Sequence, residues 1–261
     1  MVEKDVYAYL EHRVEALRRT DKTGDERKVV DEVFDKQTLM TLYELMTAGM
    51  LESVEYPIST GKEGNVFLAK DPDGDEMALK IFRTSTSTFK RISRYIEGDP
   101  RFKGLSGSRR KVIYAWTGKE YRNLQRYYEA EVNVPEPIAH KNNCLLMEFL
   151  GENGVSAPKL KDAHMNDPDD IYEGVLAFIV DGYREARLVH GDLSEYNILL
   201  MDDEPILIDC GQAMTADFYN AAELLERDIR NVNRFFRLRG VKVTEQDEIL
   251  EMVHEKEEEE E

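Results

Sequence analysis

Residues 188–213 read LVHGDLSEYNILLMDDEPILIDCGQA, and the polar residues in this stretch stand at fixed spacings inside an apolar frame. Asp192 precedes Asn197 by five residues, and Asp209 follows twelve residues later at the end of an apolar run. A single loop Asp is usually a turn former, but this combination is typical of ATP-dependent phosphotransferases, which place a base and metal ligands in this way. The stretch therefore predicts a phosphotransferase site.

Each of these three residues has an expected role. Asp192 is expected to be the catalytic base, or at least the group that orients the nucleophile. Asn197 and Asp209 are expected to bind the metal ions, Mg²⁺ or Mn²⁺, that neutralise charge on the transferred phosphate of ATP. His190 is expected to shape the loop by packing and hydrogen bonding.

Composition is that of an ordinary globular protein. The 261 residues can form one large domain or two smaller lobes, and 41% are hydrophobic and 34% charged. No window approaches the roughly 18–20 apolar residues that span a bilayer, so no membrane association is expected. The N-terminus carries acidic residues, unlike a signal peptide, and the two cysteines lack metal-ligand spacing. A cytoplasmic location is the expectation.

The net charge of −18 argues against indiscriminate nucleic-acid binding, but two segments run against it. Residues 83–111 hold nine basic side chains and two acidic ones, among many Ser and Thr. Four arginines repeat at helical spacing further on, opposite an apolar face: Arg227, Arg230, Arg234 and Arg237. This arginine face has two open interpretations, a solvated helix surface or a functional one.

The Gly-rich loop of protein kinases, G-x-G-x-x-G-x-V, is followed by a strand bearing V-A-I-K. Here the sequence from 77 to 80 is MALK, so Lys80 matches the lysine that compensates phosphate charge. The loop positions are occupied by Ser59, Gly61, Gly64 and Val66, with Lys62 between them. Glycines allow the backbone to approach phosphate oxygens. A Walker A loop is excluded, because Glu63 follows Gly61-Lys62 where Ser or Thr is required.

Three further residues complete the expected nucleotide site. Glu120 lies on a predicted helix and is expected to pair with Lys80, although an ordinary surface Glu is the alternative. The apolar strand from Cys144 ends in Gly151 and is expected to be the hinge, where the backbones of Glu148 and Leu150 would bind adenine.

Periodicity and turn residues place the remaining elements. A hairpin is expected over 58–82, and the low hydrophobicity of 84–110 predicts a mobile insertion. Thr38 is expected to cap a helix that ends at Gly49. The other expected helices span 3–19, 116–128, 171–186, 221–239 and 245–254.

Taken together, several segments resemble the RIO family of atypical protein kinases, most closely its first subfamily. They are STGKEGNVF (59–67), MALKIFR (77–83), GDPRF (98–102), WTGKEYRNL (116–124), LLMEFLGE (145–152), LVHGDLSEYN (188–197) and IDCGQA (208–213). The resemblance covers roughly residues 20–240. Residues 1–55 are too short for the winged-helix domain expected of the second subfamily.

The resemblance implies an α+β, two-lobed kinase-like fold, with an antiparallel sheet, a truncated helical second lobe and no activation segment. It also implies ATP with Mg²⁺ or Mn²⁺, serine autophosphorylation and late maturation of the small ribosomal subunit. Family members are thought to cycle as ATPases through a phosphorylated aspartate, which would be Asp209. The basic segment 83–111 would contact pre-ribosomal RNA or protein.

On this basis the expected domains are a helical extension (1–55), a first lobe (56–150) with the basic insertion 84–110, a second lobe (151–254) and an acidic tail (255–261). Candidate phosphoacceptors are Ser85, Ser87, Ser106 and Ser108, the last two being favoured beside a basic triplet. Autophosphorylation there would add negative charge to the basic segment.

Two alternatives remain at this level. H-G-D-x-x-x-x-N also occurs in small-molecule kinases of the aminoglycoside or choline type, and a ribosome-assembly factor could use ATP only as a conformational switch. Gly191 and Ser194 stand where many protein kinases carry Arg and Lys, which predicts slow protein phosphorylation without activation-loop control. The oligomeric state stays open.

Overall fold

The computed structural model describes residues 33–96, 102 and 108–255. The expected helix at 3–19, Ser106 and residues 256–261 of the acidic tail lie outside these residues. The chain divides into two compact units. The first unit comprises Met1–Tyr121, Pro137–Phe149 and Asn153–Val155, and the second comprises Arg122–Glu136, Leu150–Glu152 and Ser156–Glu261.

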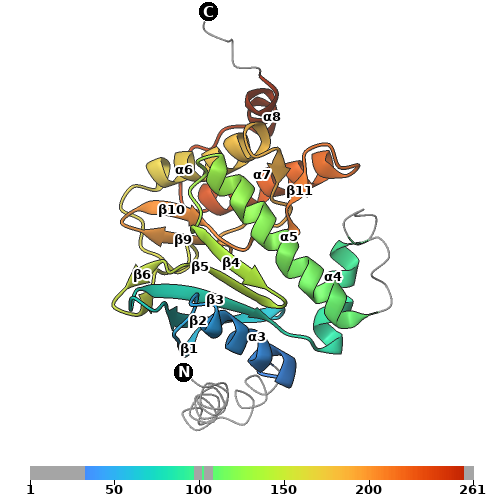
Figure 1. Cartoon of the computed structure of the whole chain (residues 1–261). Coiled ribbons are helices and arrows are strands. Elements are labelled where there is room, and N and C mark those ends of the chain that lie inside the picture. Colours follow the sequence, from blue (N-terminus) through green and yellow to red (C-terminus); the bar gives the residue numbers. More distant parts are fainter. Residues whose placement is uncertain (1–32, 97–101, 103–107, 256–261) are drawn as a thin grey trace, which may run out of the picture. The chain divides into compact units, whose positions relative to one another are not determined.

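The first unit contains an antiparallel five-stranded sheet in the order β1-β2-β3-β5-β4 (Figure 1). Its strands are β1 (Ser53–Thr60), β2 (Gly64–Lys70), β3 (Glu76–Phe82), β4 (Pro137–Lys141) and β5 (Cys144–Glu148). The helices are α3 (Lys36–Thr47), α4 (Thr86–Tyr95) and α5 (Arg109–Glu129), whose last turns belong to the second unit. The expected hairpin over 58–82 is confirmed as β2 and β3.

The turn of this hairpin forms for the reason its sequence indicates. The Asp71 side chain accepts the backbone N–H groups of Asp73 and Asp75, each at 2.9 Å. Gly74 has a φ of +92°, a conformation that costs a glycine nothing. Local chemistry therefore sets the register of β2 on β3.

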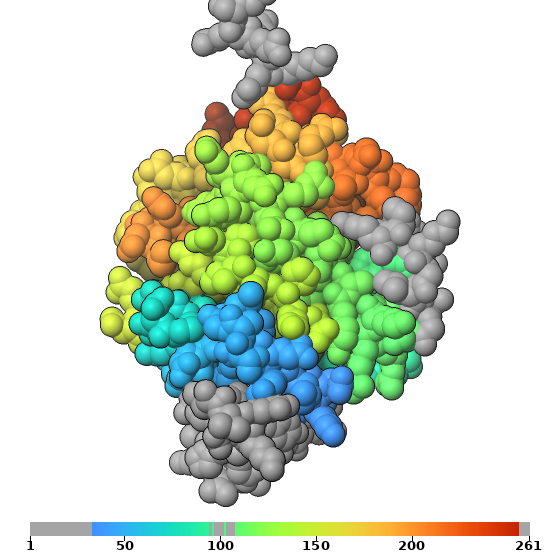
Figure 2. Space-filling view, in the orientation of Figure 1, coloured from blue at the N-terminus to red at the C-terminus, as the bar shows by residue number. Residues whose placement is uncertain are grey.

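Helix α3 covers one face of the sheet with its apolar side. Leu42 and Leu45 lie in one buried cluster with Phe67, Leu79 and Ile81 of the sheet. On the other side of α3, Lys36, Gln37 and Thr47 are exposed, and Figure 2 shows this N-terminal part of the chain in blue at the surface. The cap differs from the expectation, because Asp35 and not Thr38 begins the helix, and its side chain accepts the N–H of Thr38 at 2.8 Å.

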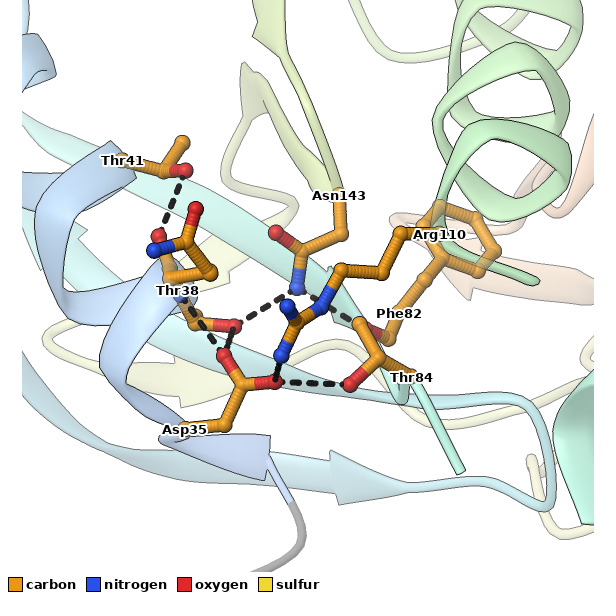
Figure 3. Close-up of polar contacts among 8 residues, drawn as sticks. Asp35, Thr38, Thr41, Phe82, Thr84, Arg110 and Asn143 are labelled. Carbon is orange, nitrogen blue, oxygen red and sulfur yellow. Dashed lines mark hydrogen bonds and ion pairs between the residues drawn. The ribbon is translucent and has the colours of Figure 1, made fainter. Parts of the chain in front are cut away.

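Asp35 also connects α3 to two other elements of the first unit (Figure 3). Its second oxygen accepts the hydroxyl of Thr84, which follows β3, at 2.8 Å and pairs with Arg110 of α5 at 3.2 Å. Burial opposes ionisation, but the bonds from Thr38 and Thr84 and the Arg110 charge together lower the pKa of Asp35. The carboxylate thus stays ionised and holds the starts of α3 and α5 together.

The expected mobile insertion at 84–110 contains α4 and the first two residues of α5, so the expectation is wrong for 86–95, while 97–101 and 103–107 lie outside the described residues. Ser85 caps α4 by accepting the N–H of Thr88 at 3.3 Å. Phe89, Ile92 and Ile96 recur at helical spacing and pack in a cluster that includes Trp116. The charged and hydroxyl residues around this apolar stripe lower the average hydrophobicity of the segment, so the sequence does not indicate a packed helix.

The second unit is mainly helical, with α6 (Pro168–Arg184), α7 (Ala221–Arg237) and α8 (Gln246–His254), close to the expected bounds. Helix α6 packs against α7, α8 and two short strands (Figure 1). The strands are β6 (Gly151–Glu152), β7 (Val155–Ser156), β8 (Leu188–Val189), β9 (Ile198–Met201), β10 (Glu204–Leu207) and β11 (Met214–Thr215), β7 being divided between the units. No helix of the described residues is long and apolar enough to cross a membrane.

Candidate active site

Two short antiparallel ladders in the second unit hold the stretch that carries the predicted catalytic residues. Strand β8 pairs with β11, with Val189 opposite Met214, and β9 pairs with β10, with Ile198 opposite Leu207. The loop 190–197 and the turn 208–213 are therefore each anchored at both ends by the same pair of ladders. This topology brings the two segments together although eleven residues or more separate them in sequence.

Asp192, Asn197 and Asp209 meet in this arrangement. The side-chain amide of Asn197 donates to the backbone oxygen of Asp192 at 2.8 Å. The N–H of Ile208 donates to the backbone oxygen of Asn197 at 2.8 Å, which places the following residue, Asp209, beside Asn197. Asp209 has φ 62° and ψ 63°, a left-handed conformation that costs a non-glycine residue about 1–2 kcal/mol and is often found at functional sites.

Burial raises the pKa of Asp192, and the negative charge of nearby Asp209 raises it further. The Arg227 charge and hydrogen bonds from Asn197 and Gln212 act in the opposite direction. The negative charges of the two carboxylates repel each other, and a cation bound by Asp209 would relieve that repulsion.

The donor set fits a magnesium ion. Because the amide nitrogen of Asn197 is engaged by Asp192, its side-chain oxygen is the atom that can act as a ligand, together with the Asp209 carboxylate. Mg²⁺ prefers oxygen ligands and is commonly held by one or two protein groups, with phosphates and waters completing the octahedron. The part of the chain that the structure describes contains no group of three or more His, Cys, Asp or Glu that could hold a metal by itself.

The structure adds two loop-holding residues that the sequence did not single out. The side-chain amide of Gln212 donates to the Asp192 carboxylate at 2.9 Å. Asn123 is buried and donates to the backbone oxygens of Cys210 and Ala213 at 2.9 and 3.0 Å, which fixes the turn after Asp209. His190 agrees with its expected role, since it is buried and its Nδ1 accepts the N–H of Asp192 at 3.3 Å.

Asp228 is a third residue that the sequence did not single out. Its carboxylate, on α7 and 1% exposed, accepts the N–H of Gly191 at 2.6 Å and that of Leu193 at 2.9 Å. Burial raises the pKa of Asp228 to about 7, although these two bonds oppose the shift. The sequence does carry a signal for Asp228, namely a carboxylate on the apolar side of a helix. A carboxylate in that position is buried, and a buried carboxylate requires hydrogen-bond or charge partners.

The first unit contains the predicted lysine and its partner. Lys80 Nζ lies 2.6 Å from Glu120 Oε1, and both side chains are buried. Lys80 projects from the middle of β3 and Glu120 from α5. The structure thus forms the predicted ion pair and excludes the alternative of a surface Glu. The role of the pair towards ATP stays a prediction.

The predicted Gly-rich loop is a tight turn between β1 and β2. Ser59 pairs with Val66 across the two strands, and the N–H of Gly61 donates to the oxygen of Gly64 at 2.9 Å. Lys62 is exposed at the tip. A Cβ on Gly64 would lie 2.4 Å from the carbonyl oxygen of Ile81, so this glycine is required for the close approach of β2 to β3.

The two predicted hinge residues belong to different units. Glu148 is the last residue of β5, opposite Met77. Leu150 belongs to the second unit, where its side chain is buried with Leu199 and Ile206. Its carbonyl accepts the N–H of Ala157 at 2.9 Å, which leaves its N–H as the group for adenine. Adenine binding by both backbones stays a prediction.

The arginine face of α7 divides into two kinds of residue. Arg230 pairs with Glu226 at 3.2 Å and Arg237 with Glu245 at 3.1 Å, and both are exposed, which favours a solvated, ion-paired surface. Arg227 differs, because its guanidinium donates to the backbone oxygen of Gly191 in the loop 190–197.

Comparison with known proteins adds independent evidence. Residues 65–249 match the family model described as the RIO domain. The chain is 43% identical over 219 residues to the RIO-type serine/threonine-protein kinase Rio1 of Haloferax volcanii, covering 84% of this chain and 75% of the relative. The protein of the same description from Methanocaldococcus jannaschii is 42% identical over 231 residues, covering 88% and 79%.

A solved structure resembles the chain as well. The Rio2 kinase–ADP/Mg²⁺–phosphoaspartate complex from Chaetomium thermophilum aligns with a TM-score of 0.66 and 26% sequence identity, covering 84% of this chain and 67% of that one. The likeness confirms the predicted kinase-like α+β fold.

Proposed function

The chain belongs to the RIO family and is an atypical serine/threonine protein kinase, and on this premise we propose that Asp192, Asn197 and Asp209 carry its chemistry. One observation supports this assignment most strongly. The two ladders of the second unit bring the loop 190–197 and the turn 208–213 together, with Asn197 and Asp209 adjacent and Asp192 within hydrogen-bonding reach of both segments.

In phosphotransfer to a serine, Asp192 accepts the proton of the hydroxyl group as its oxygen bonds to the γ-phosphorus of ATP. The bond from that phosphorus to the β-phosphate oxygen breaks, and ADP leaves. Asn197 and Asp209 hold Mg²⁺, which supplies charge neutralisation on the phosphates. The raised pKa of Asp192 suits a base, since a more basic carboxylate takes the proton more readily near neutral pH.

In this proposal the first unit supplies the phosphate contacts, and the adenine contacts come from Glu148 of the first unit and Leu150 of the second. Lys80 binds phosphate oxygens, and Glu120 keeps its ammonium group in place. The Gly61–Gly64 turn presents backbone N–H groups to the phosphates with Lys62 at its tip, while Glu148 and Leu150 bind adenine through their backbones. Mn²⁺ is expected to replace Mg²⁺, because oxygen ligands accept both ions.

ATP hydrolysis through an aspartyl phosphate is the second part of the proposal. The related Rio2 structure contains a phosphoaspartate with ADP and Mg²⁺. In this chain Asp209 is the proposed acceptor: its carboxylate oxygen attacks the γ-phosphorus, ADP leaves, and water later releases inorganic phosphate. The left-handed backbone at Asp209 holds this carboxylate on a turn instead of in a strand.

Serine autophosphorylation would occur in the basic segment 83–111. Ser108 immediately precedes α5, and its carbonyl accepts the N–H of Val112 at 3.1 Å, so it stands at the N-cap position. A phosphate there would be favoured by the helix dipole and by the neighbouring Arg109 and Arg110. Ser108 is accordingly the acceptor we propose among the described serines.

A cytoplasmic role in small ribosomal subunit maturation is also proposed. It is supported by the RIO family resemblance and by the basic segment 83–111 within a chain of net charge −18. Co-sedimentation of the protein with immature small subunits, compared with a variant in which Lys90 and Arg91 are Ala, tests it. Equal sedimentation of both proteins would show that the basic segment 83–111 does not contribute to binding the immature subunits.

The kinase assignment is tested by incubating the protein with γ-labelled ATP and Mg²⁺, alone and with amino-sugar or choline acceptors. Serine label and hydroxylamine-sensitive aspartyl label on the protein itself are expected, with none on the small molecules. Label on a small molecule without self-labelling would favour a small-molecule kinase and refute the proposal.

A further inference from the structure

The loop 190–197 lacks the cations that many protein kinases place there, because Gly191 and Ser194 occupy the positions of an Arg and a Lys. The fold brings a cation to this loop from elsewhere. Arg227 of α7 donates a guanidinium N–H to the backbone oxygen of Gly191, the residue immediately before Asp192. These two residues are 36 positions apart in sequence.

The peptide group between Gly191 and Asp192 consequently has both of its polar atoms engaged. Its oxygen accepts from Arg227, and its N–H donates to Nδ1 of His190 at 3.3 Å. The flanking N–H groups are both held by Asp228, and Gly191 itself has a φ of +75°. The orientation of this peptide plane sets the direction in which the Asp192 side chain leaves the backbone. Asp228 binds the flanking N–H groups but not the Gly191 carbonyl, and Arg227 binds that carbonyl.

Charge gives a second effect of the same residue. The guanidinium of Arg227 bonds the peptide group that precedes Asp192, and the Asp228 carboxylate bonds the N–H of the same Gly191. Arg227 therefore places a positive charge next to the loop that carries Asp192. Arginine keeps its charge at any physiological pH, so this contribution is permanent.

The other arginines of α7 do not share this geometry. Arg230 and Arg237 pair with glutamates on the surface. Arg234 stands seven residues after Arg227 and is exposed, and its side chain has no partner among the contacts of the described residues. The arginine face therefore contains one residue directed at the loop and others that provide matched controls.

We propose that Arg227 is a positioning residue for phosphotransfer. From α7 it supplies the positive charge that the loop 190–197 lacks, and it holds the Gly191–Asp192 peptide group in the orientation that catalysis requires. The inference rests on the proposed role of Asp192. It deepens that role by making the orientation of Asp192 depend on two adjacent helix residues, Asp228 for the N–H groups and Arg227 for the carbonyl.

The test compares Arg227→Met, Arg227→Gln and Arg227→Lys with Arg234→Met as control and Asp192→Asn as reference. Self-phosphorylation gives kcat and the KM for ATP, calorimetry gives ADP binding, and thermal unfolding reports folding. We expect the two neutral variants to lose about 10- to 100-fold in kcat, as for a misoriented catalytic group. KM, ADP binding and the unfolding midpoint should stay close to wild type, and Lys should restore part of kcat.

A merely structural residue would lower the unfolding midpoint and ADP binding together, and would not be rescued by Lys. If a folded Arg227→Met or Arg227→Gln protein has the same kcat as Arg234→Met, the inference is wrong. If Asp192→Asn is inactive in the same experiment, the proposed function is unaffected by that result. Full activity of Asp192→Asn would instead refute the site assignment and the inference with it. Because Arg227 is exposed, at least one neutral variant is expected to fold.

Discussion

Gly64→Ala separates packing from phosphate binding in the Gly-rich turn. The added methyl would lie 2.4 Å from the carbonyl oxygen of Ile81 and 3.1 Å from Cα of Phe82, both backbone atoms of β3. Neither can rotate away, so β2 must move off β3 by most of an ångström and lengthen the first bonds of the ladder. Overpacking of this kind costs about 1–3 kcal/mol.

Thermal unfolding measures this cost directly. For a chain of this size about 1 kcal/mol corresponds to roughly 2–4 °C, so Gly64→Ala should lower the midpoint by about 2–12 °C. Gly61→Ala is the matched control, because its new methyl meets only the oxygen of Gly64, at 3.1 Å. The control should keep its midpoint within about 2 °C and raise the KM for ATP. A wild-type midpoint for Gly64→Ala would refute the packing argument.

Three other substitutions have defined outcomes. Glu120→Gln removes the carboxylate that lies 2.6 Å from the buried Lys80 ammonium, so the free energy of unfolding should fall in denaturant unfolding and the KM for ATP should rise. Tyr127→Phe should raise stability by about 1 kcal/mol, because the described residues offer its buried hydroxyl no hydrogen-bond partner; a loss would indicate one. Asp228 has a pKa of about 7 when folded and about 4 when unfolded, so the native state binds the extra proton between these values. Stability should therefore fall as pH rises from about 4 to 7, and Asp228→Asn should flatten that dependence.

The sequence predicted those parts of the site that lie close together in the chain. Asp192, Asn197 and Asp209 share one stretch of about twenty residues, and their spacing reflects the two ladders that hold them. The β2–β3 hairpin was predictable because Asp71 and Gly74 determine its turn locally. The ion pair of Lys80 with Glu120 is more distant, and its prediction came from the order of elements in kinases.

Residues whose function depends on tertiary contacts were not predictable in this way. Asp228 and Arg227 are adjacent on α7 and act on a loop more than thirty positions earlier, and no local pattern specifies that meeting. Helix α4 was missed because its stripe of Phe89, Ile92 and Ile96 gains stability only by packing on the cluster around Trp116. In both cases the structure depends on contacts between residues that are far apart in the sequence.

Mutant kinetics show whether Asp192 and Asp209 carry the phosphotransfer. The measurement is ATP turnover and serine self-phosphorylation at saturating Mg²⁺-ATP for wild type, Asp192→Asn and Asp209→Asn. Asp202→Asn is the control, because it lies in the exposed β9–β10 turn at a φ of 54° that Asn also adopts. We predict a loss of about 100-fold or more for Asp192→Asn and Asp209→Asn and none for the control. Wild-type rates in either active-site variant would show that the substituted carboxylate does not take part in phosphotransfer.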